Sequence, residues 1–277
     1  ISGSGGLDLN AAIGSGATAG ATSLAVTGAT ALGADVTTSG AQTYTGLVTA
    51  DVAAKRTLTG STITLTGGLD GGAQALDIAG DLITGAAMTN ITVLDVSGTA
   101  RLGGSVTTAD SLTIDGTLTL TTNITLDSTG NDATDDITLA AISGTDGGAT
   151  ESLVLDAGAA GAISVSGAVT GLEDLSLTLS DGATFAAVTL NNDFTITGAT
   201  TGANITFNGN LSLGGDFITA ASNYNIAINE DITVADQVTF TNTGLLVLGN
   251  GTDDILTFTG GLVATAPSAI TLNGKII

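Results

Sequence analysis

The chain contains no cysteine, no histidine and no tryptophan, and its single proline is Pro267. Without cysteine and histidine, neither a Ser-His-Asp triad nor a Cys-His pair can form, which excludes nucleophilic catalysis of these kinds. Zinc sites lose their usual ligands for the same reason, and no disulfide framework can form. We therefore predict no catalytic residue and expect that the protein is not an enzyme.

Basic residues are scarce as well. Four Lys and Arg stand against 26 Asp and Glu, which gives a formal net charge of −22 at pH 7. Such a chain repels nucleic-acid phosphates and anionic membrane surfaces, so we expect no nucleic-acid partner. Of the acids, 23 are Asp and three are Glu, and Asp favours turns and caps over helical surfaces.

Long apolar runs are also missing. None approaches the roughly 18–20 residues of a transmembrane helix, so we predict no transmembrane segment. The chain begins at Ile1 without a basic segment followed by an apolar one, and no signal peptide is visible. No proline-rich or charged linker divides the sequence. We interpret residues 1–277 as one continuous body, either a processed chain or a fragment of a larger protein.

A short triplet recurs along the chain: an aliphatic residue or Phe, then Thr or Ser, then another apolar residue. Strand side chains alternate between two faces, so each triplet directs two apolar groups inward and one hydroxyl outward. Helical periodicity is absent. We therefore predict short strands at 63–65, 112–114, 118–120, 124–126, 137–139, 175–177, 188–190, 194–196, 205–207, 211–213, 238–240, 256–258 and 270–272.

The triplets follow one another closely. From Leu112 to Leu126 the apolar pairs recur at a constant short spacing, and the Asn-Gly and Asp-Gly pairs typical of tight hairpins are too sparse to close every turn. If the chain bends the same way at each corner, successive turns stack in parallel and bury a column of side chains. Only 3% of the residues are aromatic. We expect this column to be narrow and filled by Val, Ile, Leu and Ala.

Internal similarity supports stacking. Residues 24–49 match 94–119 at an offset of 70, including Leu32-Gly33 with Leu102-Gly103 and Val36-Thr37-Thr38 with Val106-Thr107-Thr108. Internal repeats are typical of solenoids. If the offset holds three coils of about 20–25 residues, the chain forms a rod about 60 Å long. We predict an all-β fold, a parallel β-solenoid of roughly 12–13 coils with no significant helix.

Two segments carry a resemblance to a known class of proteins. These are residues 36–46, VTTSGAQTYTG, and residues 57–64, TLTGSTIT. They resemble repeats of large bacterial surface proteins of the filamentous-haemagglutinin and adhesin type, and similar Gly/Thr/Asp-rich sequences occur in some surface-layer proteins. The resemblance implies a right-handed parallel β-helix that is exported to the cell exterior. The resemblance is one of residue sequence in these short segments and one of general composition over most of the chain.

Calcium is the one metal that the sequence suggests. Residues 249–255, GNGTDDI, resemble the calcium-binding nonapeptide of repeat toxins, with Leu248 where the first glycine belongs. Calcium takes about six to eight oxygens, and the nonapeptide supplies them only when copies stack in tandem. The alternative interpretation is a solvated acidic corner. The candidate calcium ligands are Asp253, Asp254 and Asn250, and a looser match runs through residues 130–137.

Other functions stay open on the same scaffold. Four adjacent acid pairs could serve glycoside hydrolysis, but adjacent strand residues face opposite sides. Threonine pairs such as those in residues 62–66 and 117–121 resemble ice-binding solenoids, whereas Thr is also the usual polar residue of an exposed strand. A glycan- or host-surface-binding module would need an exposed aromatic or polar cluster. The acid pairs are Asp135-Asp136, Glu173-Asp174, Glu230-Asp231 and Asp253-Asp254.

The function that we expect is structural. A solenoid leaves open strand edges at its ends, which must be capped or joined to another copy. We therefore predict an extracellular or cell-surface bacterial protein that forms the shaft or repeating subunit of an adhesin, fibre, biofilm component or surface layer. Its expected partners are further copies of itself, stacked end to end into a filament, with cell-surface glycans as the alternative.

Overall fold

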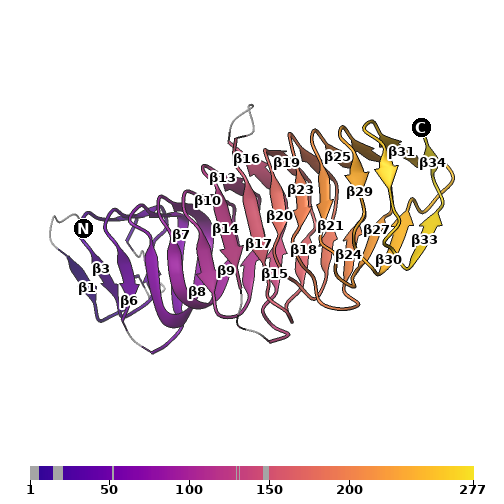
Figure 1. Cartoon of the computed structure of the whole chain (residues 1–277). Coiled ribbons are helices and arrows are strands. Elements are labelled where there is room, and N and C mark those ends of the chain that lie inside the picture. Colours follow the sequence, from indigo (N-terminus) through magenta and orange to yellow (C-terminus); the bar gives the residue numbers. More distant parts are fainter. Residues whose placement is uncertain (1–5, 15–20, 52, 129, 131, 146–149) are drawn as a thin grey trace.

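The protein, described here from a computed structural model, is an elongated stack of parallel turns (Figure 1). The structure describes residues 6–14, 21–51, 53–128, 130, 132–145 and 150–277. Over these residues the strand pairs are parallel, helix is absent and the chain makes about 12 turns. The predicted all-β parallel solenoid is confirmed. No helix of the described residues has the length and apolarity needed to cross a membrane.

Each turn contributes one strand to each of three columns, which we call faces A, B and C in chain order. Three long strands bend around corners and serve more than one face: β7 (Arg56–Leu65), β8 (Leu69–Thr84) and β9 (Met88–Val96). The other strands of face A are β1 (Leu7–Leu9), β3 (Thr30–Leu32), β6 (Val48–Ala50), β11 (Val106–Thr108), β14 (Ile124–Asp127), β17 (Leu153–Asp156), β20 (Leu175–Leu177), β23 (Phe194–Ile196), β26 (Phe217–Thr219), β29 (Val238–Thr239) and β32 (Leu262–Val263).

Faces B and C continue in the same way. Face B contains β4 (Val36–Thr37), β12 (Leu112–Ile114), β15 (Ile137–Leu139), β18 (Ile163–Val165), β21 (Ala183–Phe185), β24 (Asn204–Phe207), β27 (Asn225–Ile228), β30 (Leu245–Leu248) and β33 (Ala269–Leu272). Face C contains β2 (Leu24–Val26), β5 (Gln42–Tyr44), β10 (Ala100–Leu102), β13 (Leu118–Leu120), β16 (Ile142–Gly144), β19 (Val169–Leu172), β22 (Val188–Leu190), β25 (Leu211–Leu213), β28 (Ile232–Val234), β31 (Ile255–Phe258) and β34 (Lys275–Ile276).

The register explains the recurring triplet. On face B, Ile114 pairs with Leu139 and Leu139 with Val165, while the central Thr113 pairs with Thr138. Apolar side chains thus stack on apolar ones inside, and hydroxyls stack on hydroxyls outside, because strand residues alternate between faces. The predicted triplets lie in strands, except that Phe240 follows β29 directly.

The internal sequence match at an offset of 70 does not correspond to a whole number of turns. Leu24 lies on face C and pairs with Gln42, whereas its match Leu94 lies on face B and pairs with Leu112. The expectation of three coils in this interval is therefore wrong. The true repeating unit is one strand and one corner, so a sequence match can shift from one face to the next.

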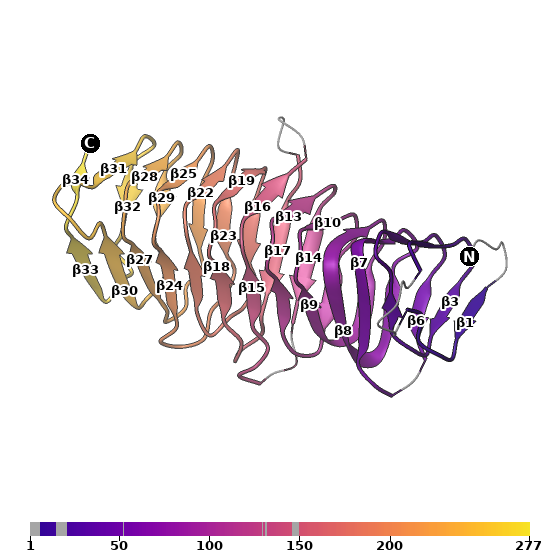
Figure 2. The same cartoon turned by 180° about the vertical axis from the view of Figure 1, so that it is seen from behind.

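Turn length varies along the stack. Leu82 pairs with Ala100 and Ala100 with Leu118, and the residue number rises by 18 over each of these turns, as it does between Asp81 and Thr99. Nearer the C-terminus, Val188 pairs with Leu211, and the rise per turn is 23, as between Asp193 and Asp216. The strands β10, β13, β22 and β25 each have three residues, so the extra residues of the longer turn lie in the corners. Figure 2 shows the same change as turns that are wider in the orange and yellow half than in the indigo half.

The core changes with turn length. The N-terminal turns bury Leu, Ile and Val, as the composition predicts, but the six Phe residues gather in the C-terminal turns. Phe185 and Phe207 stack on successive turns of face B with ring centroids 5.4 Å apart, and Phe194 meets Phe217 edge to face at 5.6 Å. The expected, almost entirely aliphatic column is therefore found only in the N-terminal part, where Tyr44 is the one buried aromatic residue among the described residues.

One polar pair lies inside the N-terminal core. The Tyr44 hydroxyl donates to Gln42 Oε1 at 2.9 Å, and Gln42 Nε2 donates to the carbonyl oxygens of Val36 at 3.1 Å and Thr59 at 2.8 Å. Both side chains are fully buried, and burial raises the pKa of the Tyr44 hydroxyl. The pair is tolerated because its polar groups bond to one another or to the backbone.

Corner side chains link each turn to the next. Asp81 Oδ1 accepts the Thr99 N–H at 2.8 Å, Asp174 Oδ1 accepts the Asp193 N–H at 3.2 Å, and Asp231 Oδ1 accepts the Ile255 N–H at 2.7 Å. Each donor lies one turn after its acceptor. The predicted concentration of Asp in turns is confirmed for these residues, and its reason is that a carboxylate satisfies a backbone donor that the strand ladder leaves free.

Candidate metal centre

The residues predicted as calcium ligands lie in the corner between β30 and β31. Asp254 is buried, and its Oδ2 accepts the N–H groups of Asn250 at 2.7 Å and Gly251 at 2.9 Å. The side chains of Asn250 and Asp253 are exposed. Asp254 therefore closes this corner around its own carboxylate. Calcium binding by Asp253, Asp254 and Asn250 stays a prediction.

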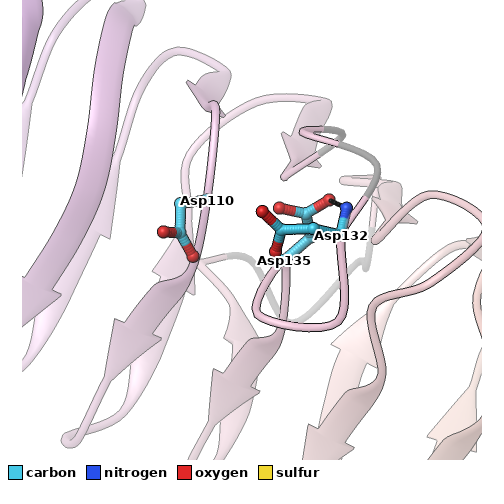
Figure 3. A group of neighbouring side chains, drawn as sticks. All are labelled: Asp110, Asp132 and Asp135. Atoms are coloured by element: carbon cyan, nitrogen blue, oxygen red, sulfur yellow. Dashed lines mark hydrogen bonds between the residues drawn. The ribbon is translucent and has the colours of Figure 1, made fainter.

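The structure brings a different set of acids together. Asp110 lies in the corner between β11 and β12, and Asp132 and Asp135 lie in the corresponding corner one turn later, between β14 and β15. One carboxylate oxygen of each residue lies within 4.8 Å of the others. Among the described residues this is the one group of three acids that meets so closely. Figure 3 shows the carboxylates of Asp132 and Asp135 side by side and facing Asp110.

Local hydrogen bonds hold one oxygen of each carboxylate. Asp110 Oδ1 accepts the Ser111 N–H at 2.7 Å, and Asp135 Oδ2 accepts the Asp132 N–H at 2.7 Å (Figure 3). Asp132 Oδ1 accepts the Thr134 N–H at 2.8 Å and also the Thr134 hydroxyl. These bonds fix the three side chains, and those from Thr134 lower the pKa of Asp132. The second oxygen of each carboxylate takes part in none of them.

Asp135 is the most buried of the three acids. Its side chain is fully buried, and its Oδ1 atom has no hydrogen-bond partner. A buried carboxylate oxygen without a donor loses its hydration and receives nothing in return. Among the described residues the one ion pair joins Lys55 to Asp77 at 2.5 Å, so no basic side chain neutralises the cluster.

One hydrogen bond within the corner and one close contact with the preceding turn position the cluster. The Ser128 hydroxyl donates to the Asp135 carbonyl at 2.5 Å, and a Cβ on Gly130 would lie 1.9 Å from the Ala109 carbonyl oxygen. Only glycine permits so close an approach. Asn131, which belongs to the looser nonapeptide match, lies outside the described residues. The segment that the sequence ranked second thus supplies two members of the cluster.

Carboxylates of the adjacent acid pairs mainly accept hydrogen bonds from backbone N–H groups. Asp136 Oδ1 accepts the Ala162 N–H at 2.8 Å, and Asp174 and Asp231 make the equivalent bonds described above. The outward hydroxyls form one column per face, because a three-residue strand has a single outward position. Thr121, at the end of a predicted threonine row, instead donates its hydroxyl to the Leu102 carbonyl at 3.0 Å.

Aromatic side chains are buried throughout. The six Phe and two Tyr residues all have less than a tenth of their surface exposed, and Phe258 is the most accessible at 7%. Burial raises the pKa of Tyr224 to about 12. Sugar-binding surfaces that depend on aromatic stacking need an exposed ring face, and none of these rings offers one.

Comparison of the chain with protein-family models, with curated proteins and with solved structures finds no match.

Proposed function

We propose that the protein is a structural solenoid of the bacterial cell exterior, acting as the shaft or subunit of an adhesin, fibre or surface layer, and that its C-terminal edge stacks on a second copy. The parallel fold supports a mechanical role, since each turn contacts only its neighbours and the stack can be extended without changing its cross-section. The resemblance of residues 36–46 and 57–64 to surface-protein repeats supports export.

The observation that carries end-to-end stacking is the exposure of core positions in the last turn. Ile270 pairs with Leu246 and Leu272 with Leu248. Leu246 and Leu248 are buried, whereas Ile270 and Leu272 are 48% and 50% exposed. These side chains hold positions that every earlier turn covers with the next one, and covering them would remove apolar surface from water.

The two ends differ. At the N-terminal end Leu9, Leu24 and Val26 are buried, although they belong to the first described turns. At the C-terminal end Ile276 is 47% exposed, and among the described residues β32, β33 and β34 have no strand beyond them. An unpaired parallel edge offers free N–H and C=O groups for a further strand. We therefore assign stacking to the C-terminal edge, which a further turn would cover whether that turn came from a second copy or from a continuation of the same chain.

Sedimentation velocity over a concentration series, together with electron microscopy, tests the assembly. We expect particles longer than one solenoid, joined at the C-terminal end, and monomers for the double variant Ile270→Asp with Leu272→Asp. The matched control is Ile218→Asp, because Ile218 is 43% exposed but lies on the side of the shaft in β26. A wild-type chain that stays monomeric at every concentration would rule out self-assembly.

Export has its own test. Antibodies raised against the folded chain should label intact cells of the source organism, and protease added outside those cells should remove the signal. Labelling that needs permeabilised cells would contradict the proposed location and leave the assembly test unaffected.

A further inference from the structure

We propose that Asp110, Asp132 and Asp135 form a binding site for a divalent cation of the calcium class, which links the corner that carries Asp132 and Asp135 to the turn before it. This inference is independent of the assembly proposed above. It rests on two observations: the convergence of three carboxylates within 4.8 Å, and the buried Asp135 Oδ1 that has no donor.

The carboxylate oxygens suit a hard cation. Asp110, Asp132 and Asp135 each have one oxygen engaged in a bond to a backbone N–H and one oxygen outside those bonds. Calcium binds carboxylate oxygens at about 2.3–2.6 Å, so two ligands on opposite sides of the ion lie up to about 5 Å apart. The observed limit of 4.8 Å is within that span. One cation could therefore contact all three side chains.

Burial and charge favour occupation. Three carboxylates so close together repel one another, and a cation removes that repulsion while it supplies the missing partner of Asp135 Oδ1. Asp132 is exposed and Asp110 is partly exposed, so water can enter and complete the coordination. Calcium accepts the irregular geometry of such a loop, whereas magnesium requires a nearly ideal octahedron.

The site joins two turns. Asp110 belongs to the short turns, and the other two ligands lie in the longer corner that follows. A bound ion would therefore stabilise the junction at which short corners give way to long ones. The corner that carries Asp132 and Asp135 should become more resistant to opening when the ion is present.

Isothermal titration of the metal-free protein with CaCl₂ at pH 7 and constant ionic strength tests the site. We expect saturable binding, a rise in the unfolding temperature with CaCl₂, and a smaller rise with MgCl₂. Asp132→Asn should weaken binding at least tenfold and is expected to fold, since Asp132 is exposed and Asn keeps an oxygen for the Thr134 N–H. Asp110→Asn should act in the same direction.

The control is Asp253→Asn, an exposed acid in the similar corner before β31. It should bind calcium as the wild type does. Absence of heat and of any calcium-specific thermal shift would overturn the proposal. So would wild-type affinity in Asp132→Asn, or loss of binding in Asp253→Asn alone, which would place the ion at the other loop.

Discussion

The turns between Leu82 and Leu118 and those between Val188 and Leu256 have the same three-strand plan but different interiors. The residue number rises by 18 per turn in the first group, which buries aliphatic side chains. It rises by 20 to 24 per turn in the second group, which encloses most of the Phe cluster. Larger inward side chains need a wider cross-section, and longer corners supply it. In these two groups a longer corner accompanies a larger core. The longest turns, which rise by 24 to 29 residues between Leu118 and Val169, bury no aromatic side chain, so long corners do not by themselves require Phe.

The largest effect should come from emptying the wider core. Phe207 contacts Phe185, Phe194 and Phe217, with ring centroids 5.1–5.8 Å apart. We expect Phe207→Ala to lower the free energy of unfolding by about 4 kcal/mol, since a buried Phe truncated to Ala costs about 3–5 kcal/mol. Leu118→Ala in the narrow core should cost about 2–5 kcal/mol, at the low end because its cavity is smaller.

Denaturant unfolding monitored by hydrogen exchange measures both variants. Because turns contact only their neighbours, each substitution should reduce protection mainly in its own part of the stack. Equal loss of protection over the whole chain in both variants would show that the two regions unfold as one unit.

The next largest difference in stability between the two regions should come from placing a larger side chain in the core. Leu118 and Leu211 both lie buried on face C, the former at the end of a short turn and the latter at the end of a long one. Leu118→Phe should destabilise the protein by about 1–3 kcal/mol through overpacking. Leu211→Phe should cost less, because it adjoins corners that already accommodate Phe. If the two variants unfold at the same denaturant concentration, corner length does not control core width.

A smaller effect is expected at the corner of β8. Ala73 has φ 58°, in the left-handed region that glycine adopts more easily. Ala73→Gly should therefore stabilise the protein by about 0.5–1 kcal/mol. The control is Ala34→Gly, whose backbone is not left-handed and which should slightly destabilise the fold. A lower melting temperature for Ala73→Gly would contradict this interpretation.

The smallest differences concern pH. Burial, with the charges of Asp193 and Asp236, raises the pKa of Asp216, so the folded state binds this proton more tightly than the unfolded state and stability rises as pH falls through the raised pKa. Hydrogen bonds from Gly72 and Asn90 lower the pKa of Asp70, and its stabilising contribution is lost as pH falls below about 3.9.

Thermal unfolding between pH 7 and pH 3 compares the two acids. Asp216→Asn should raise the melting temperature at pH 7 and lose that advantage below about pH 3.9, whereas Asp70→Asn should lower it at pH 7 only. The idea fails if Asp216→Asn melts below the wild type at pH 7.

Most of the fold could be predicted from local pattern. Triplets such as 112–114 and 118–120 identify strands because alternation is a property of a few neighbouring residues. The Phe cluster was also within reach, since Phe185 and Phe207 are separated by one turn of that region, and so are Phe194 and Phe217. Composition alone predicts an aliphatic column instead, because it carries no information on spacing.

The acid cluster could not be found in this way. Asp110 and Asp132 meet only because the corner of one turn lies on the corner of the previous one, and that register depends on a loop of unusual length. A contiguous motif predicts calcium ligands in residues 249–255. The sole buried acid of that segment, Asp254, instead accepts hydrogen bonds from backbone N–H groups of its own loop. A local motif indicates the chemistry of a single loop. A site formed between two turns can be predicted only when the register of those turns is known.

The corner bonds between turns have a direction. Asp81, Asp174 and Asp231 accept the N–H of a residue that follows them in the chain. Wherever a backbone N–H donates to a side chain of a neighbouring described turn, the N–H belongs to the later turn. A finished turn thus displays acceptors that only later chain can satisfy. In a polypeptide that emerges N-terminus first, these acceptors are already in position when the next turn appears. The solenoid can therefore fold turn by turn from its N-terminus.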